Sequence, residues 1–236
     1  RLQALRQGSP GSGEVSTAAP RATAVKELHV LQDLYQSLDQ LAYTDPLTLL
    51  PNRAQFRECL DRFTARDRRQ NAGFALLMMD LNGFKQVNDR FGHPAGDRLL
   101  HDVARRFAAV MRTGDVLSRL QAAASGQPQD DLLARLGGDE FGILLPGVTG
   151  RAEAAAVAEK LLRALDEPFV LAPDQCCTVG LSIGIAFYPA DSADMEKLVA
   201  MADSAMYSAK RQGIGYVYAQ SADPQPDAPL PHAQLP

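Results

Sequence analysis

The stretch Asp131–Gly147 reads DLLARLGGDEFGILLPG, and its pattern decides the fold. An apolar run lies on each side of Gly137-Gly138, a pair that tolerates the positive φ angles of a tight two-residue turn. The pattern therefore predicts a buried β-hairpin with Asp139 and Glu140 at the start of the return strand. Two adjacent carboxylates beside such a turn indicate either a solvated loop or part of a metal site, and the remaining sequence must decide between them.

The composition is that of a globular protein without a strong charge bias. Of the 236 residues, 46% are hydrophobic and 22% are charged, and the formal net charge is -4. This balance excludes a broadly basic surface of the kind that binds nucleic acid, so we expect no nucleic-acid partner. No apolar run approaches the roughly 18 residues that a membrane-spanning helix needs, so we expect no membrane segment in this chain.

Cysteine usage indicates a reducing compartment. The chain has three cysteines, Cys59, Cys176 and Cys177, and no CxxC pair. An odd count with two adjacent residues is not a disulfide framework. We therefore expect a cytoplasmic location, which includes the cytoplasmic part of a larger, membrane-anchored sensor.

Four segments are expected along the chain. Residues 1–22 are rich in Gly, Ser, Pro and Ala and are predicted to be a disordered lead, and residues 221–236 to be a Pro-rich tail or linker. Residues 23–43 carry an amphipathic helical stripe, which either dimerises as a signalling helix or packs on the domain behind it. The folded domain is expected at residues 44–220. The stripe consists of Leu28, Leu31, Tyr35, Leu38 and Ala42.

Helical and strand patterns alternate through the folded domain. The run FALLMMDL at 74–81 is apolar almost throughout, which predicts a strand buried on both faces. Helices interleaved with a mixed sheet make the predicted fold class α/β, an α+β sandwich of about 170 residues. Expected helices cover 53–67, 95–110, 152–165 and 195–212, and expected strands cover 74–81, 132–136, 141–145 and 178–188.

A second acidic position follows the buried strand. The strand ends in Asp80, and Asn82-Gly83 then signals a tight turn. Such an acid either caps a helix, faces water, or holds a metal ion while nearby backbone groups approach a phosphate. If this strand neighbours the hairpin, two or three carboxylates converge at one end of the sheet. Mg²⁺ favours a few hard oxygen ligands completed by water and phosphate oxygens.

The motifs together resemble those of the GGDEF-domain diguanylate cyclases. RLGGDEF at 135–141 resembles the family signature, and DPLTLLPNR at 45–53 is similar to its opening motif. The segment at 80–100 resembles the metal- and guanine-binding region. LSIGIA at 181–186 and ADSAMYSAKRQG at 202–213 are similar to a later strand and the C-terminal helix. The matches run in family order from about residue 43 to 216, across nearly the whole folded part.

The resemblance implies a nucleotidyl-cyclase-like central sheet of about five strands flanked by helices. It implies the condensation of two GTP molecules into cyclic di-GMP with release of two pyrophosphates, by attack of a ribose 3′-hydroxyl on the α-phosphate of the facing GTP. Two copies of the domain would face each other as a homodimer, each holding one GTP. The implied cofactor is Mg²⁺, with Mn²⁺ as an alternative, and the product is also a candidate inhibitor.

The resemblance also implies roles for individual residues. Asp80 would bind the metal through its carboxylate and Leu81 through its carbonyl group. Asp139 would bind the metal and help to deprotonate the 3′-hydroxyl, while Glu140 would support the metal or substrate geometry. The remaining implied substrate-binding residues are Lys85 and Lys210 at the triphosphate, Asn88 and Asp97 at the guanine edge, His93 near the base or ribose, and Phe84.

Some of these assignments have plain structural alternatives. Asn88 also suits a helix cap, Asp97 a first-turn helix acid, and His93 an ordinary loop histidine. Guanine offers N1–H and N2–H₂ donors to a carboxylate at Asp97, whereas adenine would leave that acid facing a lone pair. A site of this kind would therefore select GTP over ATP.

The sequence departs from the family pattern at two short positions. Leu49 stands where the opening motif usually has Gly, which affects one turn rather than the chemistry. Ile214 and Gly215 stand where Arg and Asn are common. Because that Arg would help to clamp the terminal phosphates, we expect weaker retention of GTP.

A third departure is an apparent insertion before the hairpin. DVLSRL at 115–120 is repeated as DLLARL at 131–136, 16 residues later, and QAAASGQPQD between them is predicted to be a small-residue loop. The Arg-x-x-Asp pattern of a candidate product-inhibition site is supplied by Arg112 and Asp115, which lie 16 residues too early. Either the insertion loops out and leaves this site in place, or inhibition is lost, or both residues are ordinary surface residues.

Three functions are compatible with this sequence. The first is an active diguanylate cyclase. The second is a catalytically weak GGDEF module that binds GTP or cyclic di-GMP as a receptor. The third is a transmission domain for another output domain, for example a phosphodiesterase beyond the Pro-rich tail.

Overall fold

The computed structural model describes residues 42–70, 73–125 and 131–220, without side chains at 66–70 and 112–125. The expected lead at 1–22, nearly all of the expected helix at 23–43 and the expected tail at 221–236 lie outside the described residues. The helices and strands of the described part are, in chain order, α2 (Arg53–Gln70), β1 (Phe74–Asn82), α3 (Phe84–Phe91), α4 (His93–Ser125), β2 (Leu132–Gly137), β3 (Glu140–Pro146), α5 (Arg151–Arg163), β4 (Phe169–Ala172), β5 (Gln175–Cys177), β6 (Gly180–Tyr188), α6 (Met195–Gln212) and β7 (Tyr216–Tyr218).

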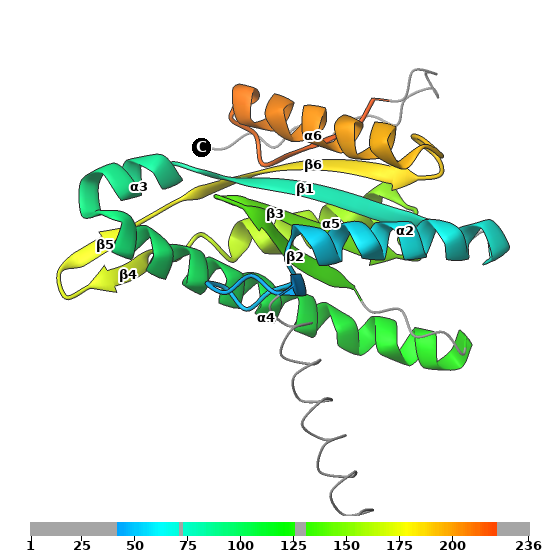
Figure 1. Ribbon diagram of the computed structural model, residues 1–236, viewed down its shortest axis with the longest axis horizontal. Coiled ribbons are helices and arrows are strands. Elements are labelled where there is room, and N and C mark those ends of the chain that lie inside the picture. The colour runs from blue at the N-terminus through cyan, green and yellow to red at the C-terminus, as the bar shows by residue number, and fades with distance from the viewer. Residues whose placement is uncertain (1–41, 71–72, 126–130, 221–236) are drawn as a thin grey trace, which may run out of the picture. The chain divides into compact units, whose positions relative to one another are not determined.

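The central sheet has five strands in the order β2-β3-β1-β6-β7 (Figure 1). Strand β1 is antiparallel to both of its neighbours, whereas β6 and β7 are parallel, so the sheet is mixed as expected. Strands β4 and β5 form a separate hairpin, which lies beside α3 at one end of the sheet (Figure 1).

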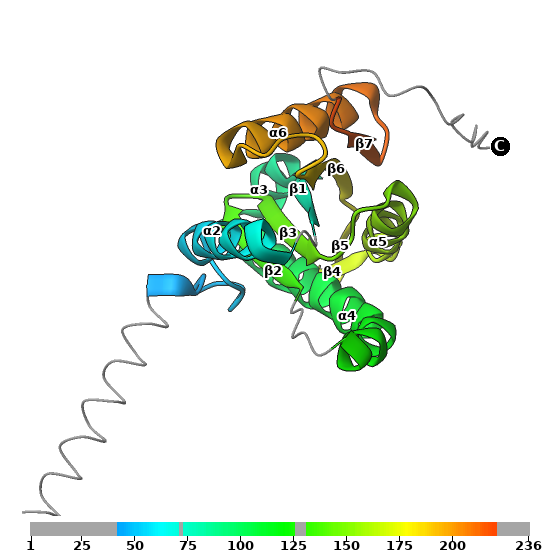
Figure 2. The same ribbon diagram turned by 90° about the vertical axis from the view of Figure 1, so that its right-hand side faces the viewer.

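Both faces of the sheet are covered by helices, as Figure 2 shows. Leu77 and Met79 of β1 pack in the same hydrophobic core as residues of α4 and α5, and Leu76 and Met78 pack with residues of α2 and α6. The continuous apolar run of β1 is thus buried on both faces, as predicted. Because side chains alternate along a strand, Asp80 falls on the face covered by α2 and α6.

Helix α6 packs directly against the sheet because β6 has a glycine beneath it. A Cβ at Gly184 would lie 1.9 Å from the carbonyl oxygen of Ala202, so a larger residue there would push the helix away. The helix begins at its N-cap Asp194, whose carboxylate accepts from the backbone N–H of Lys197 at 3.0 Å, and ends before Gly213 at φ 66°. These features place the last turn of α6, which carries Lys210, near the end of β1.

The insertion before the hairpin is wrongly predicted as a loop over its first half. Helix α4 runs without a break to Ser125 and so includes residues 121–125, whereas residues 126–130 lie outside the described part. Alanine-rich sequence continues a helix readily, which explains the extension. Arg112 and Asp115 therefore lie within α4, but their side chains are not described. Among the described helices, none is both long and apolar enough to cross a bilayer.

Candidate active site

The two acidic segments meet as the sequence predicts. Strands β1 and β3 are neighbours, and their register places Asp80 opposite Glu140. The backbone N–H of Leu81 donates to the carbonyl oxygen of Asp139 at 3.2 Å, which joins the end of β1 to the hairpin turn. Both acids of the hairpin are therefore held beside the acid of β1.

The turn itself differs by one residue from the prediction. Gly137 pairs with Glu140, so Gly138 and Asp139 are the two turn residues and Asp139 lies at the tip rather than in the return strand. Gly137 and Gly138 have φ angles of 138° and 56°, which only glycine adopts without strain. The bulge in β2 between Arg135 and Gly137 produces this shift.

Asp80 carries the shortest ion pair of the site. The Nζ atom of Lys210 lies 2.5 Å from Oδ1 of Asp80, and the two side chains are 44% and 13% exposed, respectively. The pair joins the last turn of α6 to the end of β1. The sequence identified both residues, but it did not predict that they contact each other.

Asp139 is held in an unfavourable environment for a charge. Burial raises the pKa of Asp139, and the negative charge of Asp80 raises it further, while Lys210 and Arg135 partly offset the increase. The folded chain therefore disfavours the ionised form of Asp139 relative to an ordinary aspartate. Like charges close together favour the binding of a cation between them.

Glu140 forms an ion pair with Arg53, a residue to which no role was assigned from the sequence. Nη2 of Arg53 lies 3.2 Å from Oε2 of Glu140, and Nε of Arg53 donates to the carbonyl oxygen of Leu136 at 2.8 Å. In the described parts of the chain, no three His, Cys, Asp or Glu side chains gather as a complete metal-binding group. A pair of carboxylates still suits Mg²⁺, which is commonly held by one or two carboxylates plus substrate phosphates and water.

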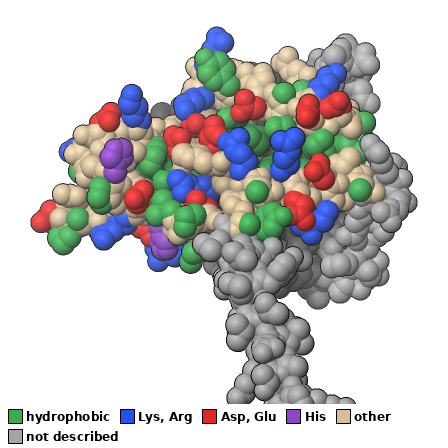
Figure 3. Space-filling view, viewed as in Figure 1, with side chains coloured by type: hydrophobic (Ala, Val, Ile, Leu, Met, Phe, Trp, Pro, Cys, Tyr) green, Lys and Arg blue, Asp and Glu red, His purple; other side chains and the backbone are tan. Residues whose placement is uncertain are grey.

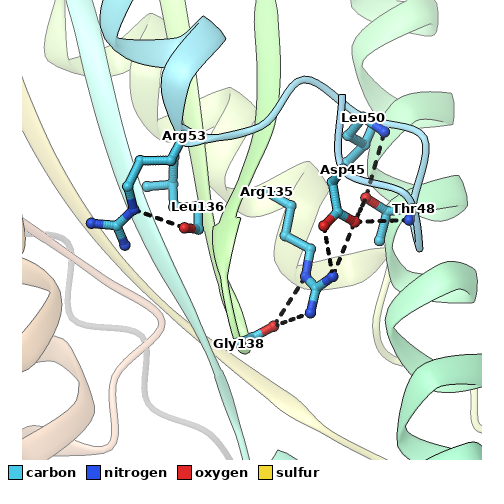
Figure 4. Close-up of polar contacts among 7 residues, drawn as sticks. All are labelled: Asp45, Thr48, Leu50, Arg53, Arg135, Leu136 and Gly138. Atoms are coloured by element: carbon cyan, nitrogen blue, oxygen red, sulfur yellow. Dashed lines mark hydrogen bonds and ion pairs between the residues drawn. The ribbon is translucent and has the colours of Figure 1, made fainter. Parts of the chain in front are cut away.

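A second arginine, Arg135, stabilises the hairpin turn by hydrogen bonds (Figure 4). Nη1 of Arg135 lies 3.0 Å from both carboxylate oxygens of Asp45, and its Nε and Nη2 atoms donate to the carbonyl oxygen of Gly138 at 3.1 and 2.9 Å. The backbone N–H and hydroxyl of Thr48 also donate to Asp45, at 2.9 and 2.7 Å. Burial would raise the pKa of Asp45, but the bonds from Thr48 and Arg135 outweigh it, so the pKa is lowered.

The ion pair between Asp45 and Arg135 thus connects the hairpin turn to the opening motif. This role was not predicted from the sequence for either residue. Arg135 lies within the quoted signature and Asp45 within the opening motif, so both were visible as motif positions. Their pairing could be recognised only from the three-dimensional structure, because the two residues are 90 positions apart in the chain.

The expected guanine-binding residues lie on α3 and α4, which pack against each other. Oδ1 of Asn88 is buried and has no hydrogen-bond partner among the described residues. A Cβ at Gly96 would lie 1.9 Å from this oxygen and 3.3 Å from the ring of Phe84. Glycine at position 96 therefore leaves room for the Asn88 side-chain oxygen in its present position between the helices. Gly96 was not recognised as a site residue from the sequence.

The other expected substrate residues surround these helices. Lys85 is exposed in the first turn of α3, and His93 is exposed at the start of α4. Asp97 is also exposed on α4, but it lies beyond the first turn of that helix. Helix α3 follows Gly83 at φ 87°, and no side chain caps its N-terminus, so its first N–H groups remain available to an anion. Acidic and basic side chains of the described residues are intermixed on the face seen in Figure 3.

An open pocket of about 370 Å³ lies on another side of α3, between that helix and the β4–β5 hairpin. It is lined by residues including Val87, Arg90, Cys176 and Cys177. None of the expected site residues lines it, so the pocket is separate from the carboxylate site.

The family model described as "Diguanylate cyclase, GGDEF domain" matches residues 42–124 and 121–215. The match is divided at the position of the apparent insertion.

Curated relatives and a solved structure agree with this match. The chain is 40% identical over 188 residues to the bifunctional diguanylate cyclase/cyclic di-GMP phosphodiesterase MucR of Pseudomonas aeruginosa, covering 79% of this chain and 25% of MucR. It is 37% identical to the diguanylate cyclase TpbB of the same species, covering 78% of this chain and 39% of TpbB. The coiled coil and GGDEF domain of DgcB from Caulobacter crescentus, solved with c-di-GMP, has a TM-score of 0.71 at 25% identity, covering 86% of this chain and 100% of that one. The chain thus spans about two fifths or less of the length of these curated relatives.

Proposed function

Because the chain belongs to the GGDEF-domain family of diguanylate cyclases, we propose that it condenses two molecules of GTP into cyclic di-GMP and two pyrophosphates. The observation that carries the proposal is the meeting of Asp80 and Asp139 at one end of the sheet, with Lys210 on Asp80. This end also adjoins α3, whose first turn carries Lys85.

The carboxylates would hold the metal ion. Asp80 and Asp139 would bind it through their carboxylates and Leu81 through its carbonyl group, with Glu140 in support. Mg²⁺, or Mn²⁺ in its place, would make the 3′-hydroxyl more acidic and neutralise charge at the α-phosphate. Its positive charge would also relieve the repulsion between Asp80 and Asp139.

The protein groups would bind and orient the nucleotide. The N-terminus of α3 and the side chains of Lys85 and Lys210 would meet the triphosphate. The unpartnered oxygen of Asn88 would accept from an N–H group of guanine, and Asp97 would accept a second one. Phe84 and His93 would contact the base or ribose. A guanine base would thus satisfy a buried acceptor that has no partner among the described residues.

Asp139 would take the proton of the 3′-hydroxyl. The 3′-oxygen then attacks the α-phosphorus of the facing GTP, and the bond from that phosphorus to the pyrophosphate oxygen breaks. Two such steps, one from each domain of a homodimer, close the cyclic product.

The decisive experiment is Mg²⁺-dependent turnover of GTP by the full chain at high protein concentration, with products separated by chromatography. Wild type should form cyclic di-GMP and Asp139→Ala should form none. Asp166→Ala removes an exposed carboxylate beyond α5 and should behave as wild type. Because each domain is half of a reaction centre, the rate should rise more than linearly with protein concentration. Strictly linear rates through the monomer–dimer range would contradict the two-site mechanism.

Ile214 favours a second candidate function, a receptor that binds GTP or cyclic di-GMP without turnover. Its side chain is 44% exposed just beyond α6, where the resembled motif commonly has an arginine. Saturable binding of GTP without product in the same assay would support this receptor. Restoration of turnover by Ile214→Arg would then identify the missing phosphate contact as the cause.

The setting of the domain is also proposed. Residues 23–43 would dimerise the catalytic domains, and the domain would work in the cytoplasm, alone or as part of a larger sensor. Arg112 and Asp115 in α4 are retained as the candidate product-inhibition site. Inhibition of wild type by added cyclic di-GMP, lost in Arg112→Ala, would support that assignment.

A further inference from the structure

We propose that Lys210 alternates between two partners, holding Asp80 when no metal ion is bound and leaving it for the phosphates when nucleotide binds. The inference rests on the proposed function, since it assigns a conformational step to the same site. It makes Lys210 a positioning residue that controls access of the metal ion to Asp80, in addition to its contact with substrate.

The geometry of the pair defines its movable member. Asp80 is only 13% exposed and lies in a strand that is paired on both sides, opposite Glu140 and Ser182. Lys210 is 44% exposed and reaches Asp80 through a flexible four-carbon side chain from the last turn of α6. The carboxylate is therefore fixed, and the ammonium group can swing away.

The pair competes with metal binding. The ammonium group contacts Oδ1 of Asp80 at 2.5 Å, and a metal ion at this site would bind the same carboxylate group. It also places a positive charge where a divalent ion would enter, and it partly relieves the charge repulsion felt by Asp139. Lys210 thus stabilises the two acids without a metal, and a metal ion must displace it.

Glu140 is held differently. Arg53 contacts Glu140 at 3.2 Å, but it is also anchored to the carbonyl oxygen of Leu136 at 2.8 Å. This second contact should hold Arg53 in place when a metal ion and a nucleotide are bound. Among the described residues, the ammonium group of Lys210 contacts the carboxylate of Asp80 and has no backbone acceptor.

The exchange couples the two ligands of the site. The phosphates of a nucleotide attract Lys210 and so remove the competitor from Asp80. Metal and nucleotide should then bind cooperatively, beyond what their direct contact with each other produces. Without nucleotide, the metal should bind weakly.

The test measures Mn²⁺ binding to the full chain without nucleotide, from the electron paramagnetic resonance signal of free Mn²⁺. Lys210→Met should bind Mn²⁺ about five to ten times more tightly than wild type, because the competing cation is gone. Lys210→Arg keeps the positive charge and should remain near wild type. Both are binding measurements and do not depend on turnover.

Lys197→Met is the matched control. Lys197 lies in the first turn of the same helix, about 20 Å from Lys210 at 1.5 Å per residue, and its removal changes the net charge by the same amount. We expect less than a twofold change in Mn²⁺ affinity. An equal tightening in both variants would show a general charge effect and overturn the exchange.

A second arm measures the coupling itself. The affinity for 3′-deoxy-GTP, which lacks the attacking hydroxyl, is determined without Mn²⁺ and at saturating Mn²⁺. The gain from Mn²⁺ should be several-fold larger in wild type than in Lys210→Met, because only wild type has a competitor to remove. Equal gains would overturn the exchange.

Asp80→Asn separates the failure of this inference from the failure of the proposed function. If Mn²⁺ binding is lost in Asp80→Asn but is unchanged or weaker in Lys210→Met, the metal site stands and the exchange is wrong. If Mn²⁺ binding persists in Asp80→Asn, the proposed metal site itself is wrong, and the proposed exchange of Lys210 is then wrong as well.

Discussion

Arg135 joins the opening motif of the domain to the turn that carries Asp139, because its Nη1 atom lies 3.0 Å from both carboxylate oxygens of Asp45. The two side chains are only 12% and 17% exposed, so this ion pair is shielded from solvent. Arg135 also donates to the carbonyl oxygen of Gly138. Replacement of Asp45 should therefore lower the stability of the domain and shift the turn that carries Asp139.

Asp45→Asn should lower the free energy of unfolding by about 2–3 kcal/mol. The change removes one partner of a largely buried pair and leaves the Arg135 guanidinium without its counter-charge. Denaturant unfolding followed by circular dichroism measures the loss. Glu58→Gln breaks an exposed pair with Arg62 at 4.0 Å and should change stability by less than about 0.5 kcal/mol. Similar losses in the two variants would contradict the assigned role of Asp45.

The Asp45 pair should also make stability fall in acid. The pKa of Asp45 is lowered from 3.8, so the folded chain favours the ionised form more than the unfolded chain does. Its stabilising contribution is present above 3.8 and disappears as the pH falls through the lower, folded-state value. Unfolding experiments between pH 6 and pH 3 should show a steeper loss for wild type than for Asp45→Asn. Parallel curves for the two proteins would argue against it.

Leu49→Gly should stabilise the chain by about 0.5–1 kcal/mol. Leu49 has φ 58°, a left-handed conformation that is costly for a branched side chain, and the side chain is 73% exposed, so little packing is lost. Leu49→Ala retains the unfavourable conformation and should not share the gain. Thermal unfolding of the three proteins tests this difference. A less stable Leu49→Gly would mean that contacts of the leucine side chain outweigh the cost of its left-handed backbone conformation.

Gly96→Ala should reduce GTP affinity at least tenfold. The added methyl group would fall 1.9 Å from Oδ1 of Asn88 and 3.3 Å from Phe84, so the Asn88 side chain would have to leave the position from which it is proposed to bind guanine. Combining it with Asn88→Ala removes the clash. The double variant should therefore regain stability without regaining affinity, as shown by unfolding and by titration with 3′-deoxy-GTP. Restored affinity in the double variant would exclude Asn88 from guanine recognition.

Asp139→Asn should raise the free energy of unfolding at pH 7 without metal, by up to about 1 kcal/mol after allowance for solvent screening. The pKa of Asp139 is raised by burial and by Asp80, so the ionised carboxylate destabilises the folded state. This penalty is absent below the unfolded-state value and grows as the pH rises through the folded-state value.

Saturating Mg²⁺ should reverse that order. Metal binding stabilises only the chain that can hold the ion, so wild type should gain more than Asp139→Asn. Melting temperatures with and without Mg²⁺, at pH 7 and again near pH 4, provide the comparison. The variant should lose its advantage at the lower pH, and an advantage that persists there would assign the effect to packing instead of charge.

The mixed sheet and the helices on both of its faces could be predicted from the sequence alone. The apolar run ending in Asp80 and the glycine-marked hairpin are local patterns, and side-chain alternation within one segment requires no long-range information. Asn88 and Lys210 were proposed as site residues only through the resemblance to the GGDEF family, whereas Asp139 was also indicated by the local patterns. These patterns were less reliable where an alanine-rich stretch extended α4 through residues 121–125, because local sequence there suits either a loop or a helix.

Only the tertiary structure decided which of these residues meet. Lys210 and Asp80 are 130 positions apart, and Arg135 and Asp45 are 90 apart, so no spacing in the sequence relates them. Their contacts depend on the strand order, on the register that places Asp80 opposite Glu140, and on the close packing of α6 over Gly184. The physical reason is that the sequence specifies which face of each element is buried, whereas charge pairing across elements depends on how those faces pack together.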